Sequence, residues 1–209
     1  DAADPAFGML AINVRCATRL LQSHGDADLR ANWLPQLSNG NWAATICISE
    51  PQAGSDVGRI RTRAKEGGDG TWRLTGEKCW ISYGDHDLTE RIGHFILARP
   101  RDAAEGTRGL SLFLVPNILD NGAPNGVSTI RIEEKLGLHA SPTCSLAFED
   151  AVGYLIGPEG RGLPTRFTMI ESMRLGVAVQ GAAVALASAA VAEDYAHDRK
   201  QGGPPDQPP

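Results

Sequence analysis

A succession of short β-forming segments is the feature that most limits how this 209-residue chain can fold. Between Trp42 and about Asp150, segments such as "WAATICIS", "TWRLTGEKCWIS", "GHFILAR" and "TCSLAFED" alternate with turns rich in Gly, Pro, Asn and Asp. β-branched and aromatic residues favour strands, and these turn residues end them. Seven or eight short strands with hairpin-length turns predict an antiparallel barrel or sandwich.

Helical patterns flank the β region on both sides. Residues 5–35 carry apolar side chains at helical spacing, followed by a short charged helix that ends near "WLPQL". A long alanine-rich helical pattern extends from about Gly162 to Lys200. We therefore predict an α+β fold in three parts: a helical part over residues 1–41, a β-barrel-like part over 42–160, and a second helical part over 161–209.

The long helix raises the question of a membrane span. Residues 175–192, "LGVAVQGAAVALASAAVA", carry no charge and are about long enough to cross a bilayer. The run is weakly hydrophobic, because alanine dominates it, a single leucine follows Leu175, and charged turns flank it. Small residues also let helices approach closely. We therefore expect no membrane span, but a helix packed on several sides within a bundle.

Charge and cysteine content narrow the classes of partner and location. The formal net charge is −5 with no basic run, so nucleic acid is not an expected partner. The four cysteines lie far apart without a C-x-x-C pair, which fits reduced thiols in a cytoplasmic protein. The sequence has no signal peptide and no initiator Met, and its tail "QGGPPDQPP" is a proline-rich turn, so we expect a segment of a longer protein.

Two strand ends carry side chains that suit ligand binding. In "ICISEPQAGSD", residues 46–56, a strand enters a bent polar loop that offers backbone N–H groups, a hydroxyl and room for a phosphate or polar heterocycle. In "GEKCWISYGDHD", residues 76–87, Trp80 and Ser82 are two apart and so face the same way. An indole beside a hydroxyl suits a flat, polar-edged ring, although a lone strand Trp is most often a core residue.

Five motifs follow one another along the chain: "ISEPQAGSD", "GEKCWIS", "KLGLHASPTCSLAFEDA", "GPEGRGL" and "MRLGVAVQGAAVALASAAVAEDYAHDRKQ". Each resembles a motif of the acyl-CoA dehydrogenases, in that family's order and over nearly the whole chain. "GDHDLTERIGHFILAR" and "GTRGLSLFLVP" resemble most closely the large branch typified by the 3-methylmercaptopropionyl-CoA dehydrogenases and some long mycobacterial acyl-CoA dehydrogenases.

The resemblance implies an FAD-dependent oxidoreductase of fatty acid metabolism. It implies α,β-dehydrogenation of an acyl-CoA thioester to the 2-enoyl-CoA, with electrons passing to an electron-transfer flavoprotein or similar acceptor, in a homodimer or homotetramer. The three parts would be the end of the N-terminal helical domain, the middle β domain and the start of a truncated C-terminal helical domain. An acyl-CoA oxidase, which passes electrons to oxygen, or a non-catalytic flavin-binding relative would fit the same scaffold.

The resemblance also implies which residues hold the cofactor. Ser49 would hydrogen-bond the pyrimidine edge of the flavin, Trp80 would stack on the ring, and the Ser82 hydroxyl would approach N5, which receives hydride. The usual Arg-x-x-Phe-Gly pattern reads "RKQGG" here, so an aromatic residue near the adenine is absent. The implied FAD contacts are Ile46, Ile48, Ser49, Ser55, Trp80 and Ser82, with Arg199 and Gln201 reaching the FAD pyrophosphate of a neighbouring subunit.

On the substrate side, the resemblance implies that Ser55 contacts the pantetheine arm and that Glu171 and Arg174 contact the CoA part. Desaturation also needs a carboxylate base for the α-proton. A minority of the family places this base directly before the arginine that matches Arg174, where this chain has Met173. Glu171 points about 200° away from Met173 around the helix, so it is a poor substitute. We therefore expect the base outside these 209 residues, predict no catalytic residue within them, and expect this segment alone to be inactive.

A different class of function rests on the acidic loop "GDHDLTER". Carboxylates and imidazoles there, from Asp85, His86, Asp87 and Glu90 together with His94, could hold a metal in a hydrolase or metal-binding module. Adjacent residues of an extended segment point in opposite directions, and the histidines lack a regular partner spacing, so no metal site is predicted. No G-x-S-x-G pattern surrounds a serine, so a serine nucleophile is not indicated.

Overall fold

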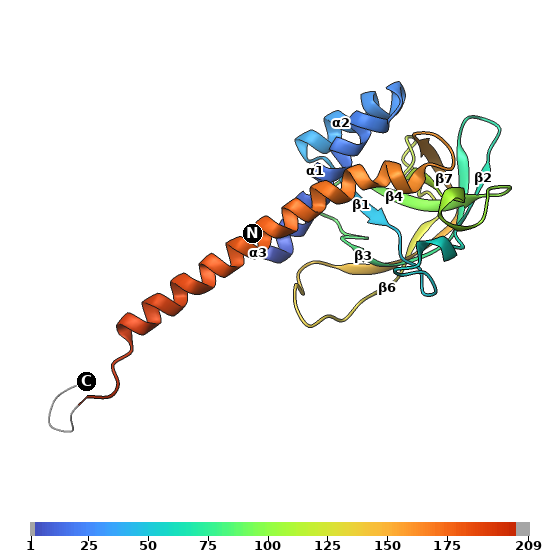
Figure 1. Cartoon of the computed structure of the whole chain (residues 1–209). Helices are drawn as coiled ribbons and strands as arrows, with labels where there is room; N and C mark the ends of the chain where they lie inside the picture. The colour runs from blue at the N-terminus through green and yellow to red at the C-terminus, as the bar shows by residue number, and fades with distance from the viewer. Residues whose placement is uncertain (1–2, 204–209) are drawn as a thin grey trace.

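The structure is a computed structural model, and it describes residues 3–203. Helices α1 (Pro5–His24) and α2 (Ala27–Asn39) pack beside a β-barrel, and the long helix α3 (Gly162–Asp198) passes α1 and then extends away from the barrel (Figure 1). The predicted α+β arrangement of a barrel flanked by helices is confirmed. The proposed division into domains at 41/42 and 160/161 stays a prediction. The expected proline-rich tail lies mostly outside the described residues.

Capping residues mark both helix starts and the end of α2. Asp4 caps α1, because its carboxylate accepts hydrogen bonds from the backbone N–H groups of Ala6 and Phe7, and Pro5 occupies the first helical position. Asp26 caps α2 through the backbone N–H of Leu29. Gly40 ends α2 in the left-handed conformation, with φ 82°, and turns the chain into the first strand.

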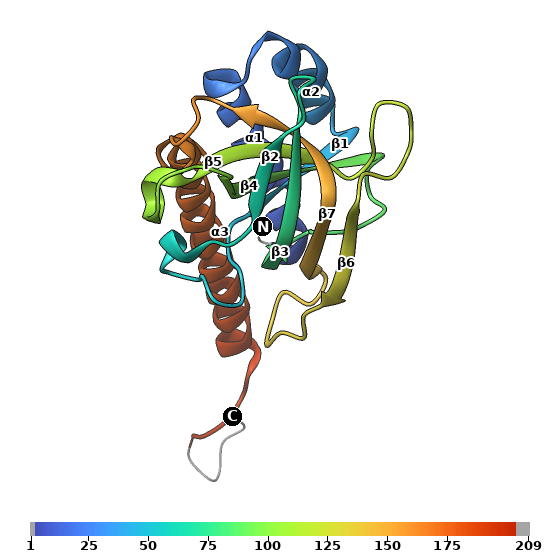
Figure 2. The same ribbon diagram turned by 90° about the vertical axis from the view of Figure 1, so that its right-hand side faces the viewer.

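The strands close into a ring. Strand β4 pairs with β2, β2 with β3, β3 with β7, β7 with β5, and β5 again with β4, so five strands form a barrel, while β1 adds to β4 and β6 adds to β7 (Figure 2). The pairings are mainly antiparallel as expected, but β1 and β2 run parallel to β4. The strands are β1 (Trp42–Cys47), β2 (Arg63–Glu66), β3 (Trp72–Ser82), β4 (Arg91–Pro100), β5 (Ser111–Pro116), β6 (Val127–Ile132) and β7 (Thr143–Ile156).

The barrel wall separates two hydrophobic cores. Along β4, Ile96 belongs to the inner core while Phe95 and Leu97 belong to the core shared with the helices. In the same way, Phe113 of β5 belongs to the inner core and its neighbour Leu112 to the outer one. Because successive strand residues point to opposite faces, both strands are buried on both sides and read as continuous apolar runs.

Helix α3 has little cover over most of its length. By length and composition alone it could cross a membrane, although only 6% of its most apolar 18-residue window is buried. The packed helix of a bundle stays our prediction for α3. The exposed large apolar side chains along α3 are Phe167, Leu175, Val177, Val179, Val184, Leu186, Val191 and Tyr195.

Candidate functional site

The two predicted strand ends lie side by side, although about thirty residues separate them in the sequence. The backbone N–H of Cys79 donates a hydrogen bond to the Ser49 carbonyl over 2.9 Å. One residue away on each segment, Lys78 Nζ donates to the Ile48 carbonyl over 3.1 Å. The loop after β1 is therefore attached to the last residues of β3 by one main-chain and one side-chain hydrogen bond.

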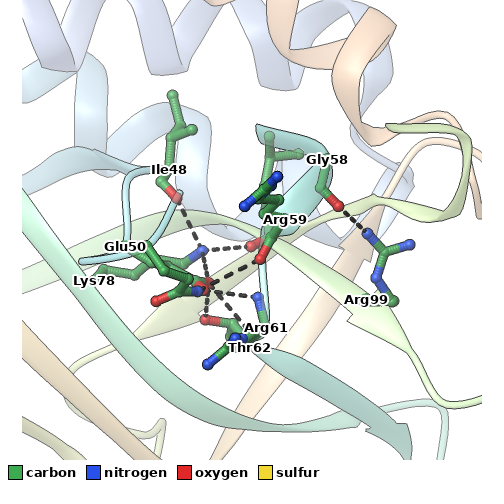
Figure 3. Close-up of polar contacts among 10 residues, drawn as sticks. Ile48, Glu50, Gly58, Arg59, Arg61, Thr62, Lys78 and Arg99 are labelled. Carbon is green, nitrogen blue, oxygen red and sulfur yellow. Dashed lines mark hydrogen bonds and ion pairs between the residues drawn. The ribbon is translucent and has the colours of Figure 1, made fainter. Parts of the chain in front are cut away.

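A buried ion pair lies beneath this junction (Figure 3). Lys78 Nζ is 2.8 Å from Glu50 Oε1, and the two side chains are 0% and 3% exposed. The ammonium also donates to the Leu97 carbonyl of β4 over 2.8 Å. This pair was not predicted from the sequence, although Glu50 stands in the motif "SEP" and Lys78 in the motif "GEK", because nothing in the sequence shows that the two motifs meet.

Glu50 is also held by the loop that follows it. Its carboxylate accepts hydrogen bonds from the backbone N–H of Arg61 over 2.7 Å, and from the backbone N–H and the hydroxyl of Thr62. Burial alone would raise the pKa of Glu50, but the charge and hydrogen bond of Lys78, with these other donors, lower it to about 2. Burial lowers the pKa of Lys78, and the carboxylate of Glu50 opposes that change. We infer that both groups are charged at neutral pH.

The loop at residues 50–56 is a tight turn with an open outer side. Glu50 and Ala53 exchange both backbone hydrogen bonds, at 3.0 and 2.9 Å, which closes the turn around Pro51. Beyond it, Ser55 is exposed, and a Cβ at Gly54 would meet nothing within 4 Å. The predicted phosphate and pantetheine contact at Ser55 thus lies on an accessible loop with a fixed base.

Trp80 is not a core residue. Its side chain is 60% exposed, while Ile81 beside it is 1% exposed and Ser82 is half-buried. The pairing of β3 with β7 shifts register between Lys78 and Ile81, so a bulge lies at this point, and Trp80 has φ 62°. An exposed indole in an unusual backbone conformation, next to a hydroxyl, needs a reason other than packing.

The other predicted cofactor and substrate residues fall into three groups. Ile46 and Ile48 are half-buried and pack against the outer core beneath the strand ends. Glu171 and Arg174 are exposed on α3, whereas Met173 packs against that same core. Glu171 and Met173 therefore lie on different sides of the helix. The remaining pair, Arg199 and Gln201, lies exposed beyond the end of α3, far from the strand ends of its own chain (Figure 1).

Three of the five candidate metal ligands, Asp85, His86 and His94, have hydrogen-bond partners within the protein. Asp85 accepts a hydrogen bond from the Thr129 hydroxyl, and His86 Nδ1 accepts one from the backbone N–H of Leu88. His94 lies inside the barrel wall with Nδ1 2.8 Å from the Thr45 hydroxyl, and burial lowers its pKa to about 4. Among residues 3–203, no three His, Cys, Asp or Glu side chains are placed to hold one metal ion.

Comparison with known proteins places these features in a family. The profile of the acyl-CoA dehydrogenase middle domain matches residues 45–151, which hold both strand ends. The chain is 41% identical to the 3-methylmercaptopropionyl-CoA dehydrogenase of Ruegeria pomeroyi, over 99% of this chain and 36% of that protein. It is 38% identical to a broad-specificity linear acyl-CoA dehydrogenase of Mycobacterium tuberculosis, over 96% of this chain and 34% of that protein.

A solved structure agrees with the sequence relatives. The glutaryl-coenzyme A dehydrogenase in complex with glutaryl-CoA superposes with a TM-score of 0.82 at 30% identity, over 98% of this chain and 50% of that one. This chain therefore spans about a third to a half of the length of these proteins. The profile match, the two relatives and the shared fold agree with the order of the motifs. The chain belongs to the acyl-CoA dehydrogenase family.

Proposed function

We propose that this chain supplies the flavin-binding part of an FAD-dependent acyl-CoA dehydrogenase, which converts an acyl-CoA thioester to its 2-enoyl-CoA. The observation that carries the proposal is the junction of the two strand ends, with the exposed indole of Trp80 and the Ser82 hydroxyl next to the loop at Ser49. A structural protein would gain nothing from leaving an indole uncovered at a backbone bulge.

The donor set fits a flavin. Trp80 offers a flat apolar face for the isoalloxazine, Ile46 and Ile48 give an apolar floor, and Ser49 and Ser82 supply polar groups for its edges. Ser55 and the open space at Gly54 suit a phosphate group. FAD when bound would supply the acceptor for two electrons and the β-hydrogen.

On the substrate side, Ser55, Glu171 and Arg174 are the proposed contacts for the pantetheine and CoA. The reaction removes the α-proton to a base and the β-hydrogen as hydride, and a C=C bond forms between the two carbons. Met173 has no lone pair basic enough for the proton and packs into the outer core. Glu171 is exposed away from it. We therefore place the base outside these 209 residues.

The expected assembly and location are also proposals. Arg199 and Gln201 follow the end of α3, which extends away from the strand ends of its own chain, and this supports a homodimer or homotetramer in which they reach a neighbour's FAD pyrophosphate (Figure 1). An electron-transfer flavoprotein or a similar protein is the proposed acceptor. Four free, buried cysteines support a cytoplasmic location.

A reduction experiment tests the proposal. The enzyme is loaded with FAD, freed of excess cofactor, and mixed anaerobically with a series of acyl-CoA thioesters. We expect retained flavin absorbance and its bleaching by at least one thioester, with the 2-enoyl-CoA as product. Protein that holds no flavin, or flavin that no acyl-CoA bleaches, would contradict the proposal. Admitting air afterwards separates the dehydrogenase from the oxidase, because only the oxidase reoxidises rapidly with oxygen.

A further inference from the structure

Helix α1 holds the end of β3 at two points. Asn13 Nδ2 donates a hydrogen bond to the Ser82 carbonyl over 3.3 Å, and the Tyr83 hydroxyl donates one to the Ala6 carbonyl over 2.9 Å. Asn13 is 1% exposed and Tyr83 is 2% exposed, so water does not replace either contact. The backbone that carries the Ser82 hydroxyl is therefore fixed to a helix that lies 69 residues earlier in the sequence.

The same short segment is strained. Trp80 has φ 62° and Tyr83 has φ 54°, so two left-handed residues other than glycine lie on either side of Ser82. Such conformations persist only where neighbouring groups hold them, and they gather at functional sites. From the barrel side, the Pro142 carbonyl accepts the backbone N–H of Tyr83 over 2.7 Å. From the helix side, Asn13 makes the hydrogen bond that reaches Ser82 itself.

Asn13 lowers the stability of the core in which it is buried. Its neighbours on the inner face of α1 are apolar and buried, among them Ile12 and Ala17. Its Oδ1 is buried and, among residues 3–203, has no hydrogen-bond partner. A buried acceptor without a partner lowers stability, so an apolar residue would serve the core better. The contact with the Ser82 carbonyl is what the asparagine adds.

We propose that Asn13 is a positioning residue for the flavin chemistry. Its amide fixes the Ser82 carbonyl, and so keeps the Ser82 hydroxyl aimed at the flavin ring, without touching the reacting atoms itself. The inference rests on the proposed function, which assigns the Ser82 hydroxyl to the flavin. It adds a residue of α1 to a site that the motifs place entirely on the barrel.

The test compares Asn13→Ala and Asn13→Asp with the wild-type enzyme loaded with FAD. The aspartate keeps the shape of the side chain and, at a pH where its carboxyl group is ionised, removes the donor. In both variants we expect FAD affinity and KM for the acyl-CoA within about twofold of wild type, and flavin reduction at saturating substrate slower by about fivefold or more, the factor of one lost hydrogen bond. Should Asn13→Ala not fold, Asn13→Asp and Asn13→Ser carry the comparison.

A double variant separates positioning from a general effect on stability. Once Ser82→Ala has removed the hydroxyl, Asn13→Ala should slow flavin reduction no further, because there is nothing left to aim. The matched control is Asn125→Ala, which removes another buried amide that donates to the Pro116 and Val152 carbonyls. That control should lower the unfolding midpoint and leave the reduction rate unchanged.

A measurement without flavin tests the same contact. In the flavin-free protein, backbone amide exchange at Tyr83 and Gly84 should be faster in Asn13→Ala than in wild type, and unchanged in Asn125→Ala. Wild-type reduction rates in both Asn13 variants, or effects that multiply with that of Ser82→Ala, would overturn the inference and leave the proposed function intact. If wild type itself holds no FAD or is not bleached, the proposed function fails, and the inference fails with it.

Discussion

The buried pair of Glu50 and Lys78 gives the sharpest test of how this site is built. Replacing Glu50 by Gln keeps the shape and leaves the Lys78 ammonium without its counter-charge, fully buried. Removing one partner of a buried pair costs about 3–5 kcal/mol. The pKa of Glu50 gives a second value, since its fall from 4.5 to about 2 corresponds to about 3 kcal/mol of stability at neutral pH. We expect Glu50→Gln to be destabilised by about 3 kcal/mol.

The assay is urea unfolding at pH 7 with a parallel thermal melt. For a domain of this size, the loss corresponds to a fall in Tm of roughly 6–12 °C. The control is Asp120→Asn, which breaks the ion pair of Arg91 with a carboxylate that is 81% exposed, and should cost less than about 1 kcal/mol. Adding Lys78→Met to Glu50→Gln should recover part of the loss, because the unpaired charge is then gone.

The dependence on pH distinguishes a charge effect from a loss of packing. Because the pKa of Glu50 is lower in the folded state, its contribution is fully present above pH 4.5 and is lost as the pH falls toward 2. The difference in unfolding free energy between wild type and Glu50→Gln should therefore shrink from about 3 kcal/mol at pH 7 to about 1 kcal/mol at pH 3. A difference under about 1 kcal/mol at pH 7, or one that is equal at both pH values, would refute the reasoning.

Three further predictions concern the site and its surroundings. Trp80→Ala should weaken FAD retention and change the flavin spectrum, while the free energy of unfolding changes by less than about 1 kcal/mol. Trp33→Ala in the core should lower the free energy of unfolding by about 3–5 kcal/mol, and an equal loss in both variants would show that Trp80 acts as a core residue. Burial lowers the pKa of His94 from 6.5 to about 4, so the free energy of unfolding of wild type should fall by about 3 kcal/mol as the pH falls from 6.5 to 4. The fall should be smaller in His94→Gln, and urea unfolding at both pH values measures it. The 209-residue chain alone should not desaturate acyl-CoA with an artificial electron acceptor, and product formation that disappears in Glu171→Gln would place the base on α3.

The pattern of strands was predictable because it depends on neighbouring residues. Turn residues and β-forming runs lie close together in the sequence, so the helix–barrel–helix order and the strand ends at Ser49 and Ser82 followed from local chemistry. The direction of β1 did not follow. Its partner β4 comes after β2 and β3, and the parallel pairing depends on a crossover between segments about fifty residues apart.

The details of the site were harder to predict than the strands that carry it. Alternation along β3 predicts that Trp80 and Ser82 face the same way, and this stays a prediction. It could not show the bulge that turns the chain at Trp80, where the consecutive residues Lys78 and Cys79 are both buried. The contact of Asn13 with Ser82 joins a helix to a strand across 69 residues, and α1 read simply as an amphipathic helix. Contacts of this kind come from tertiary packing and leave no periodic signal.

The choice of lysine at position 78 explains how the loop after β1 is held against β3, although these two strands do not pair with each other. The segment at Ile48 has left β1 and its carbonyl would otherwise lack a partner in the junction. An ammonium carries three donor hydrogens, and here three oxygens surround it: the Ile48 carbonyl, the Leu97 carbonyl and the Glu50 carboxylate. A neutral side chain of similar length has too few donors, and the planar guanidinium of arginine spreads its donors in one plane. The compact charge joins the loop, the barrel wall and the turn at a single atom, and Glu50 compensates for the burial of that charge.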